Sequence, residues 1–591
     1  MHYTELHCHS YYSFQEGASS IEELIETAKL LDYPALALTD HNNLCGALSF
    51  AQIAKTSGIQ PITGVEITLT NNSHLTLIAK DRKGYSNLCN LITNASMQSD
   101  HKFPQLDPIY LQNHSDGIIL LTGCPRGSIP DLISKGLFEQ AESVLRHHLE
   151  SFGPSNVFIE LQNNFAKGDS SRNAQLVRLG NKLGVPVVAT NNVHYHKKDR
   201  YRLQNALVAI KLNQSLESAS PYLKTNDHYH LKSYDQMSKI FRNTPEALKN
   251  TIRISEQCSL DLSKDLKYEF PDYPAPEGHT PLSYLQEICY KAAIRRYGEI
   301  NSKIKDRLEE EFRLINKHNL SGFLLIYHDI IQMAREVMVD LGLVDREIPL
   351  EERPPGRGRG SSVAMLVGYL IGLSHIDPLE FNLSLDRFLP EDMVSVPDID
   401  LDFPRNIREE LIKRVHSQWG WDHAALTGMI NTYHMKSAIQ DIGKVLGLPK
   451  HSLSQLINRV ESSNAQNLSL EMESLPEFKD RINTPVWKDL IDLSYQLDGF
   501  PRYLAQHPGG MIFSSSPLTD MVPIQPANIS GRYICQWDKD TIDYAKFIKI
   551  DFLGLGTLSQ MQDILRLIEE RKGYYIDLSR INFNDQQVYN S

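Results

Sequence analysis

The sequence predicts a multidomain protein that is α/β in its first part and α+β in the rest. Residues 1 to about 230 alternate short β-rich runs with helical stretches, a pattern typical of a parallel sheet covered by helices. The proline-rich segment 268–278 interrupts all periodicity and marks a domain boundary. A helical pattern over about residues 430–500 lies between regions with short strands. This order predicts a helical subdomain inserted into an α+β domain.

The elements follow in order along the chain. In the first part we expect a parallel, barrel-like arrangement with helices at residues 21–31 and 137–152 and strands at 35–39, 75–79, 117–122, 157–161 and 185–190. Farther on, a helix is expected at residues 363–370 and strands are expected at 510–514 and 547–552.

Length and composition limit the class of protein. The 591 residues correspond to about four domains at roughly 150 residues each. Hydrophobic content of 41% and charged content of 22% exclude wholesale disorder, collagen and coiled coil. No apolar run approaches the ~18 residues of a membrane span, and no signal peptide precedes residue 20, so we expect no membrane and a cytoplasmic location.

The cysteine spacing and the net charge argue against further kinds of structure and partner. The seven cysteines are scattered without a CxxC pair, which argues against a disulfide framework or a zinc ribbon. The net charge of −12 argues against coating nucleic acid by bulk charge. A local basic groove stays open as an alternative.

Metal-competent side chains gather in the first part. His7 and His9 are two residues apart, so in a strand both imidazoles share a face. Further candidates follow the likely strand ends, where α/β barrels place their chemistry: His41, Glu66, His74, Cys124 and His194. Such a mixture suits zinc, manganese or iron, and two or three ions could activate water against a phosphate ester. Any one of these histidines, taken alone, is more often a satisfied core or surface residue.

The segment from Glu5 to Ser10 (ELHCHS), with Asp40-His41 and Gly64-Val65-Glu66, resembles a PHP domain, the polymerase-and-histidinol-phosphatase metal barrel. The resemblance implies Zn²⁺ or Mn²⁺ bound by His7, His9, Glu16, His41, Glu66, His74, Cys124, Asn192 and His194. Glu16 stands where the replicative-polymerase version usually has Asp. Asn192 replaces an Asp and offers only a neutral carbonyl, which bears on metal occupancy and hydrolytic activity.

Three aspartates form a second candidate site. In the run VPDIDLDF, Asp398, Asp400 and Asp402 alternate with apolar residues, so their side chains project from one face of a strand. Like charges this close repel unless a cation neutralises them, and oxygen-only ligands favour magnesium or manganese. The alternatives are a calcium-type structural site or a solvated edge strand.

A glycine-rich loop precedes the aspartates. The run GRGRGSS at 356–362 enters a predicted helix, and backbone N–H groups at a helix start bind phosphate. Taken alone, a flexible surface turn would be the better interpretation. The strand at 547–552 adds Lys549 and Asp551 among apolar residues. Together these parts suit two-metal nucleotidyl transfer.

These elements resemble, in order and spacing, the palm of the bacterial DNA polymerase III alpha subunit, the C-family replicative polymerase. The series includes Gly358 to Ser361, Asp398 to Asp402, His507 to Gly510 and Asp551 to Leu555. The resemblance implies a polymerase-beta-like nucleotidyltransferase palm in which Asp398, Asp400 and Asp551 bind two Mg²⁺ ions. It implies triphosphate contacts from Arg359, Gly360, Ser361 and Lys549.

The resemblance also implies the domain order. It gives a PHP domain at 1–268, palm at 269–428, thumb at 429–500, returning palm at 501–560 and the start of fingers at 561–591. It covers nearly all of this chain but only about the first half of a complete polymerase. The implied partners are primer-template DNA, dNTPs, the remaining polymerase half and replisome subunits such as the sliding clamp.

The resemblance thus implies a DNA-directed DNA polymerase. Two alternatives remain open. One is a metal-dependent phosphoesterase or 3′–5′ exonuclease in the PHP domain, and the other is a non-catalytic, truncated polymerase fragment.

Overall fold

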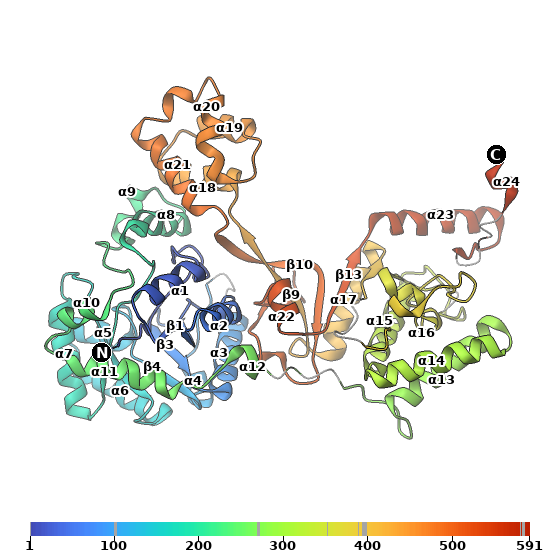
Figure 1. Ribbon diagram of the computed structural model, residues 1–591, viewed down its shortest axis with the longest axis horizontal. Helices are drawn as coiled ribbons and strands as arrows, with labels where there is room; N and C mark the ends of the chain where they lie inside the picture. The colour runs from blue at the N-terminus through green and yellow to red at the C-terminus, as the bar shows by residue number, and fades with distance from the viewer. Residues whose placement is uncertain are drawn as a thin grey trace.

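The computed structural model describes residues 2–99, 103–266, 268, 272–350, 353–387, 389–392, 399–578, 581 and 585–590. The N-terminal barrel lies at one end of an elongated molecule, a second sheet lies in the middle, and further helices form the other end (Figure 1). The helices within residues 435–497 lie above the barrel. Among these described residues, no helix combines the length and apolar character needed to span a membrane.

The first sheet has six strands in chain order. They are β1 (Ala35–Leu38), β2 (Gln60–Thr68), β3 (His74–Ala79), β4 (Ile118–Leu121), β5 (Val157–Gln162) and β6 (Val187–Thr190). Parallel bridges from Glu5 to Leu36 and from Cys8 to Val193 place the N-terminal segment between β1 and the segment after β6. The N-terminal segment therefore closes the sheet into the expected barrel.

The expectation of an all-parallel sheet is wrong at β3. This strand runs antiparallel to both β2 and β4. A short turn, in which the Leu69 amide donates to the Ser73 carbonyl, joins β2 to β3, and so short a connection can only reverse the chain.

Alternate residues along the barrel strands face either the surrounding helices or the barrel interior. The outward residues, such as Leu36, Leu77 and Ile159, pack in a large core against the surrounding helices. The inward residues Ala37, Ile78 and others form a small apolar cluster. Inward Glu66 and Glu160 continue the same alternation as buried carboxylates. The barrel interior therefore has an apolar layer and a polar layer.

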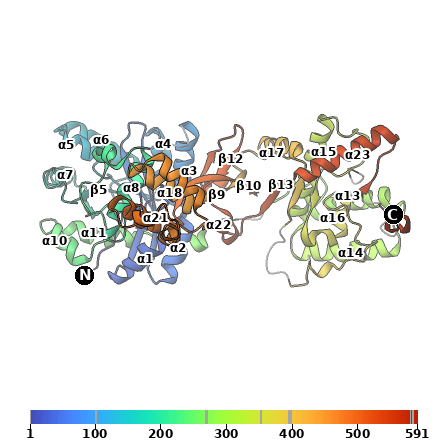
Figure 2. The same cartoon turned by 90° about the horizontal axis from the view of Figure 1, so that it is seen from above.

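Helices surround the barrel (Figure 2). They are α1 (Ile21–Leu30), α2 (Ala47–Thr56), α3 (Arg82–Gln98), α4 (Ile109–Asn113), α5 (Ser128–Ser134), α6 (Phe138–Phe152), α7 (Asp169–Leu183), α8 (Tyr201–Lys211), α9 (Leu216–Ala219), α10 (Tyr234–Ile240), α11 (Pro245–Gln257) and α12 (Leu262–Asp265). The start of α1 shows why the sequence places it there, because Ser20 and Glu23 form a reciprocal capping box.

The second sheet has seven strands in the order β11-β12-β9-β10-β13-β8-β7. Their bounds are β7 (Arg357–Gly358), β8 (Leu401–Phe403), β9 (Ala424–Thr432), β10 (Pro501–Phe513), β11 (Ile524–Pro526), β12 (Tyr533–Cys535) and β13 (Lys549–Gly554). The helices of this part are α13 (Pro281–Tyr297), α14 (Ser302–Lys317), α15 (Ser321–Asp340), α16 (Leu366–Leu370), α17 (Arg405–Trp419), α22 (Lys539–Tyr544), α23 (Gly556–Lys572) and α24 (Gln586–Tyr589). β10 begins nine residues before the strand expected at 510–514, and its first half pairs with β9.

The helices of the inserted subdomain follow β9 and precede β10. They are α18 (Met435–Val445), α19 (Lys450–Arg459), α20 (Leu468–Ser474) and α21 (Pro485–Leu497). Their apolar residues form a core of their own that also includes Leu203 and Leu207 of α8. The subdomain therefore rests on a helix of the barrel as well as on the β9–β10 ribbon.

The barrel and the second sheet share one continuous core. Trp537 is fully buried and its indole N–H donates to the Leu44 carbonyl at 3.3 Å. The Tyr85 hydroxyl donates to the Met521 carbonyl at 3.0 Å. Tyr268 stacks on Phe547 with ring centroids 4.3 Å apart. These contacts attach the barrel to the second sheet.

Candidate functional site

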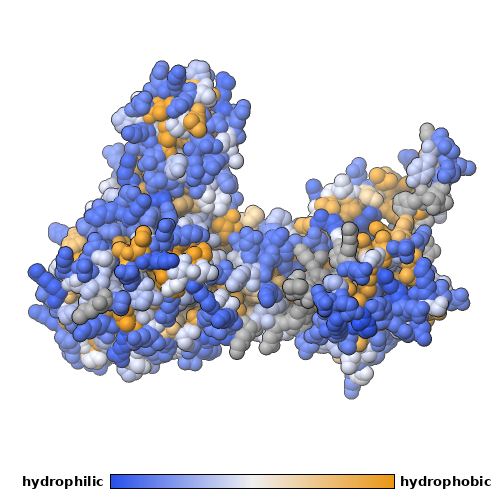
Figure 3. Space-filling view, viewed as in Figure 1, coloured by the Kyte–Doolittle hydropathy of each residue, from blue (hydrophilic) through white to orange (hydrophobic). Residues whose placement is uncertain are grey.

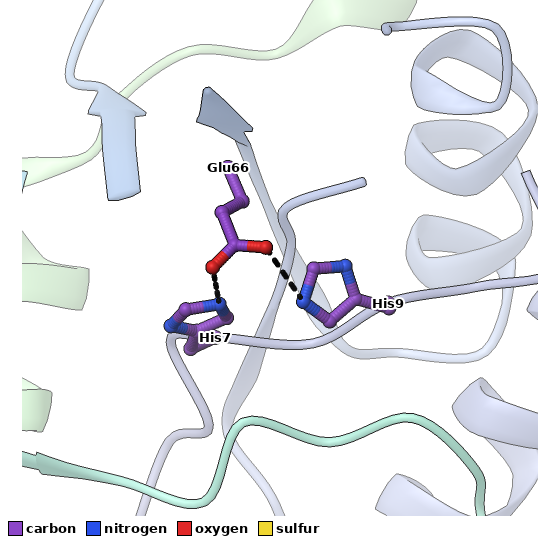
Figure 4. Close-up of side chains that lie close together, drawn as sticks. All are labelled: His7, His9 and Glu66. Carbon is purple, nitrogen blue, oxygen red and sulfur yellow. Dashed lines mark ion pairs between the residues drawn. The ribbon is translucent and has the colours of Figure 1, made fainter. Parts of the chain in front are cut away.

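Two barrel histidines face one carboxylate (Figure 4). His7 Nε2 lies 3.4 Å from Glu66 Oε1, and His9 Nε2 lies 3.7 Å from Glu66 Oε2. Both histidines come from the N-terminal segment that closes the barrel, and Glu66 comes from β2. The three side chains are almost completely buried and belong to a polar cluster at this end of the barrel, which we call the cup.

A second trio shares Glu66. The ligand atoms of His41, Glu66 and His74 all lie within 4.8 Å of one another. Cys124 Sγ lies 3.5 Å from His74 Nδ1, and Glu16 Oε2 lies 3.0 Å from His41 Nδ1. The structure therefore brings seven of the nine predicted ligands into one network.

The other two predicted ligands lie on the segment after β6. His194 stacks on His9 with ring centroids 4.5 Å apart. Asn192, two residues earlier, is buried and adopts a positive φ of 48°. The turn at Asn192 and the stacking of His194 place both residues at the same end of the barrel.

Groups behind the histidines orient them. Glu160 Oε1 lies 2.6 Å from His7 Nδ1, and Ser13 Oγ lies 3.0 Å from His9 Nδ1. Ser13 in turn donates to Asp40. With each Nδ1 engaged, the Nε2 atoms are directed into the cup. The sequence analysis missed Glu160, although a carboxylate inside the apolar run 157–161 was a usable signal.

Charge pairing shifts the proton affinities in the cup. Burial alone would lower the pKa of His7, but Glu160 and then Glu66 raise this pKa to about 10. Burial would raise the pKa of Glu66, whereas His74 and His7 hold this pKa well below its usual range. Burial lowers the pKa of His9 to about 3. His9 is therefore a neutral imidazole and Glu66 an ionised carboxylate, the forms that bind metal, whereas His7 carries a proton that metal binding would release.

Several buried polar atoms in the cup lack a hydrogen-bond partner among the described residues. These atoms are His7 Nε2, His9 Nε2, Glu66 Oε1, His74 Nε2, Asn192 Oδ1 and His194 Nδ1. Buried polar atoms are costly unless they are satisfied. Nitrogen and oxygen atoms clustered in this way fit divalent zinc or manganese, so the residues present suit the metal that the fold implies.

A second carboxylate cluster lies on the seven-stranded sheet. β13 and β8 are parallel, with Phe552 opposite Leu401 and Leu553 opposite Asp402. One residue earlier in this register, Asp551 lies beside Asp400. Asp400, Asp402 and Asp551 therefore share one face, while Leu401 and Phe552 are buried on the other. Asp398 lies outside the described residues.

Two basic side chains neutralise these carboxylates. Arg359 Nη2 lies 3.1 Å from Asp400 Oδ2, and Arg359 Nε lies 2.9 Å from Asp402 Oδ2. Lys549 Nζ lies 3.1 Å from Asp551 Oδ2. One oxygen each of Asp402 and Asp551 is buried without a hydrogen-bond partner among the described residues. Burial raises the pKa of Asp402, and the nearby Arg359 guanidinium partly offsets this effect.

The glycine-rich loop runs beside this cluster. β7 pairs with β8, so Arg357 lies opposite Asp402 and Gly358 opposite Leu401. A side chain at Gly358 would come within 2.8 Å of the Leu373 carbonyl oxygen, and Gly360 has a φ of +75°. Both positions therefore require glycine. Gly360 and the Ser361 backbone open a short 3₁₀ helix, Gly360–Ala364.

The helix expected at 363–370 is only partly correct. The 3₁₀ turn occupies its first residues, and α16 begins at Leu366. Glu311, which is fully buried, accepts the amides of Leu366 and Val367, each at 2.8 Å. The start of α16 is thus already capped, and the phosphate site expected at the glycine-rich loop stays a prediction. The carboxylate that accepts these two amides comes from the separate helix α14, and no local sequence pattern predicts the contact.

Replacing Glu311 by alanine is expected to destabilise the fold by about 3 kcal/mol. The change removes the acceptor of two buried amides and of the Arg307 guanidinium, whose Nε lies 2.7 Å from Glu311 Oε1. Urea unfolding measures the loss. Glu309→Ala, at an exposed site on the same helix, is the matched control and should cost below about 0.5 kcal/mol. Equal midpoints for the two variants would contradict the capping role.

Family models match the two parts of the chain in which these candidate sites lie. Residues 5–164 match the PHP domain model, and residues 283–554 match the model described as the bacterial DNA polymerase III alpha NTPase domain. An error-prone DNA polymerase of Symbiobacterium thermophilum is 33% identical over 607 residues, covering 100% of this chain and 54% of that protein. DNA polymerase III subunit alpha of Bacillus subtilis is 32% identical over 596 residues, covering 100% and 51%. The chain thus spans about half the length of these relatives.

Proposed function

This chain belongs to the bacterial DNA polymerase III alpha family, with a PHP domain ahead of the family's NTPase domain, and we propose that it adds deoxynucleotides from dNTPs to a primer 3′ hydroxyl on a DNA template. The observation that carries the proposal is the face shared by Asp400, Asp402 and Asp551 beside the glycine-rich loop. Among chemistries that use clustered carboxylates and a phosphate-binding loop, two-metal nucleotidyl transfer uses every part of this arrangement.

Each residue has a proposed task. Asp398, Asp400 and Asp551 would hold two Mg²⁺ ions, which supply activation of the primer hydroxyl and neutralisation of the leaving pyrophosphate. Asp402 would support them. It is the more buried of the two described aspartates that pair with Arg359. Lys549, the Gly360 amide and Ser361 would bind the triphosphate. Arg359 would move from Asp400 and Asp402 to the triphosphate once Mg²⁺ takes its place, because its fork fits phosphate oxygens equally well.

The domain assignment is part of the proposal. Residues 1–268 form the PHP domain, 269–428 and 501–560 the palm, 429–500 the thumb and 561–591 the start of fingers. The space-filling view shows a deep hollow between the inserted helices and the far end of the molecule, above the second sheet (Figure 3). Primer-template DNA would lie in this hollow. The remaining polymerase half and replisome subunits such as the sliding clamp would be partners.

Binding of dNTP tests the nucleotide site without requiring polymerisation. Equilibrium dialysis should detect Mg²⁺-dependent binding of dATP, and Lys549→Met should weaken it about tenfold, the usual effect of losing one charge-assisted hydrogen bond. Lys546→Met, an exposed lysine three residues earlier, should leave the affinity unchanged. Binding without Mg²⁺ dependence, or equal affinity in Lys549→Met, would contradict the assignment.

A second activity is favoured by the unpaired atoms of the barrel cup. Buried imidazole nitrogens and a shared Glu66 suit a Zn²⁺ or Mn²⁺ centre for hydrolysis of phosphate esters, including a 3′–5′ exonuclease. The cup is formed by elements separate from the sheet that carries Asp551. The two activities would therefore respond independently to mutation.

A further inference from the structure

Two lysines approach the barrel cup, and they differ in their partners. Lys211, the last residue of α8, forms an ion pair with Glu16 Oε1. Lys224 is half-buried, and among the described residues it forms no ion pair with a carboxylate. Its Nζ instead lies 4.3 Å from the centre of the Tyr229 ring. The charge of Lys211 is thus already compensated, whereas that of Lys224 is not.

Contacts through neighbouring residues link Lys224 to the cup. The Tyr201 hydroxyl donates to the Lys224 carbonyl at 2.8 Å. The Tyr229 carbonyl accepts the His194 amide at 2.9 Å, and the two rings meet edge to face at 6.1 Å. His194 in turn stacks on His9. A continuous series of contacts therefore runs from the ammonium of Lys224 to the cup.

The electrostatic surroundings of Lys224 agree with this placement. Burial lowers the pKa of Lys224, while Cys124, Glu66 and Glu16 act in the opposite direction. The same ammonium contributes to lowering the pKa of His194, after burial itself. The charge of Lys224 therefore interacts with four of the predicted metal ligands.

We propose that Lys224 binds a phosphoryl oxygen of the phosphate ester that occupies the PHP cup. A fixed cation beside a metal centre repels the metal unless an anion lies between them, and a phosphoryl group supplies that anion. The contact with the Tyr229 ring holds the ammonium in place and leaves its N–H groups available to donate hydrogen bonds. Lys224 would be a substrate-binding residue, and the inference rests on the proposed phosphoesterase site.

Calorimetric titration of the Mn²⁺-loaded chain with inorganic phosphate tests this role. Lys224→Met should weaken phosphate binding about tenfold or more, the effect of losing a charge-assisted contact, with an unchanged metal content. Lys224→Arg should retain most of the affinity. Lys211→Met, which removes the same charge from the same rim, is the control and should change phosphate affinity less than about threefold, because Glu16 already compensates that charge.

The ligand is then varied to identify the ester. Titration with dTMP reports a monoester, and titration with the dinucleotide dTpdT reports a diester. A selective loss of either in Lys224→Met supports the contact and assigns its class. Phosphate affinity within about threefold of the wild type in metal-loaded Lys224→Met would overturn the role of Lys224 alone. A wild-type chain that holds no divalent ion would overturn the PHP site itself.

Discussion

Asp551→Asn is expected to lower primer extension at least about a thousandfold. The carboxylate lies beside Asp400 in the register of β13 and β8, and its Oδ1 is buried without a hydrogen-bond partner among the described residues. Metal-held charge contributes several kcal/mol to such transition states, and about 4 kcal/mol corresponds to a thousandfold in rate. Incorporation of labelled dNTP, by the chain alone and with the remaining polymerase half supplied separately, measures the effect.

Two comparisons separate chemistry from folding in this experiment. Asp543→Asn, at an exposed position of α22, should keep full activity. Thermal unfolding should show Asp551→Asn still folded, although Lys549 loses the carboxylate 3.1 Å from its Nζ. Extension by folded Asp551→Asn at the wild-type rate would show that the palm carboxylates are assigned wrongly.

Glu66→Gln is expected to remove most of the divalent metal from the barrel. Glu66 belongs to both trios of potential ligands, so one substitution takes a charged ligand from each. Phosphoesterase activity should then fall at least about a hundredfold, because changes to groups that only orient the ligands already cost 10- to 100-fold in such centres. Incorporation of dNTP should change little. Elemental analysis of the dialysed protein counts the ions.

The matched control for Glu66→Gln is Glu26→Gln, an exposed position on α1. It should keep the metal content and both activities of the unchanged chain. Equal metal content in Glu66→Gln and Glu26→Gln would show that the cup is not a metal centre. Hydrolysis that persisted without metal would point to another catalytic group.

Local patterning predicted the parts of the fold that depend on neighbouring residues. Strands β1, β4 and β5 lie within two residues of their predicted bounds, because each is a short apolar run ended by turn residues. The reversed direction of β3 depends on the length of one turn. The first half of β10 is only partly apolar and forms a strand because β9 supplies a partner. Such pairing depends on contacts between distant residues, so a short stretch of sequence does not predict it.

The candidate sites also combine features that local sequence predicts with features that depend on the folded structure. Spacing in the sequence indicated that Asp400 and Asp402 share a face, and the structure places them so. The pairing of Glu311 with the start of α16 joins residues more than fifty positions apart. The contact of Arg359 with Asp400 and Asp402 likewise depends on the pairing of β7 with β8. Residue types and spacing indicate candidate ligands, whereas the groups that orient them through hydrogen bonds become apparent only in the folded structure.

Anomalous scattering from Mn²⁺ in crystals of the chain with a non-hydrolysable dNTP would locate the metal ions and the nucleotide together. We expect Mn²⁺ beside Asp400 and Asp551, with the triphosphate over Gly360 and with Arg359 released from the aspartates. Nucleotide bound elsewhere, or no Mn²⁺ at these aspartates while Arg359 still bridges Asp400 and Asp402, would contradict this expectation.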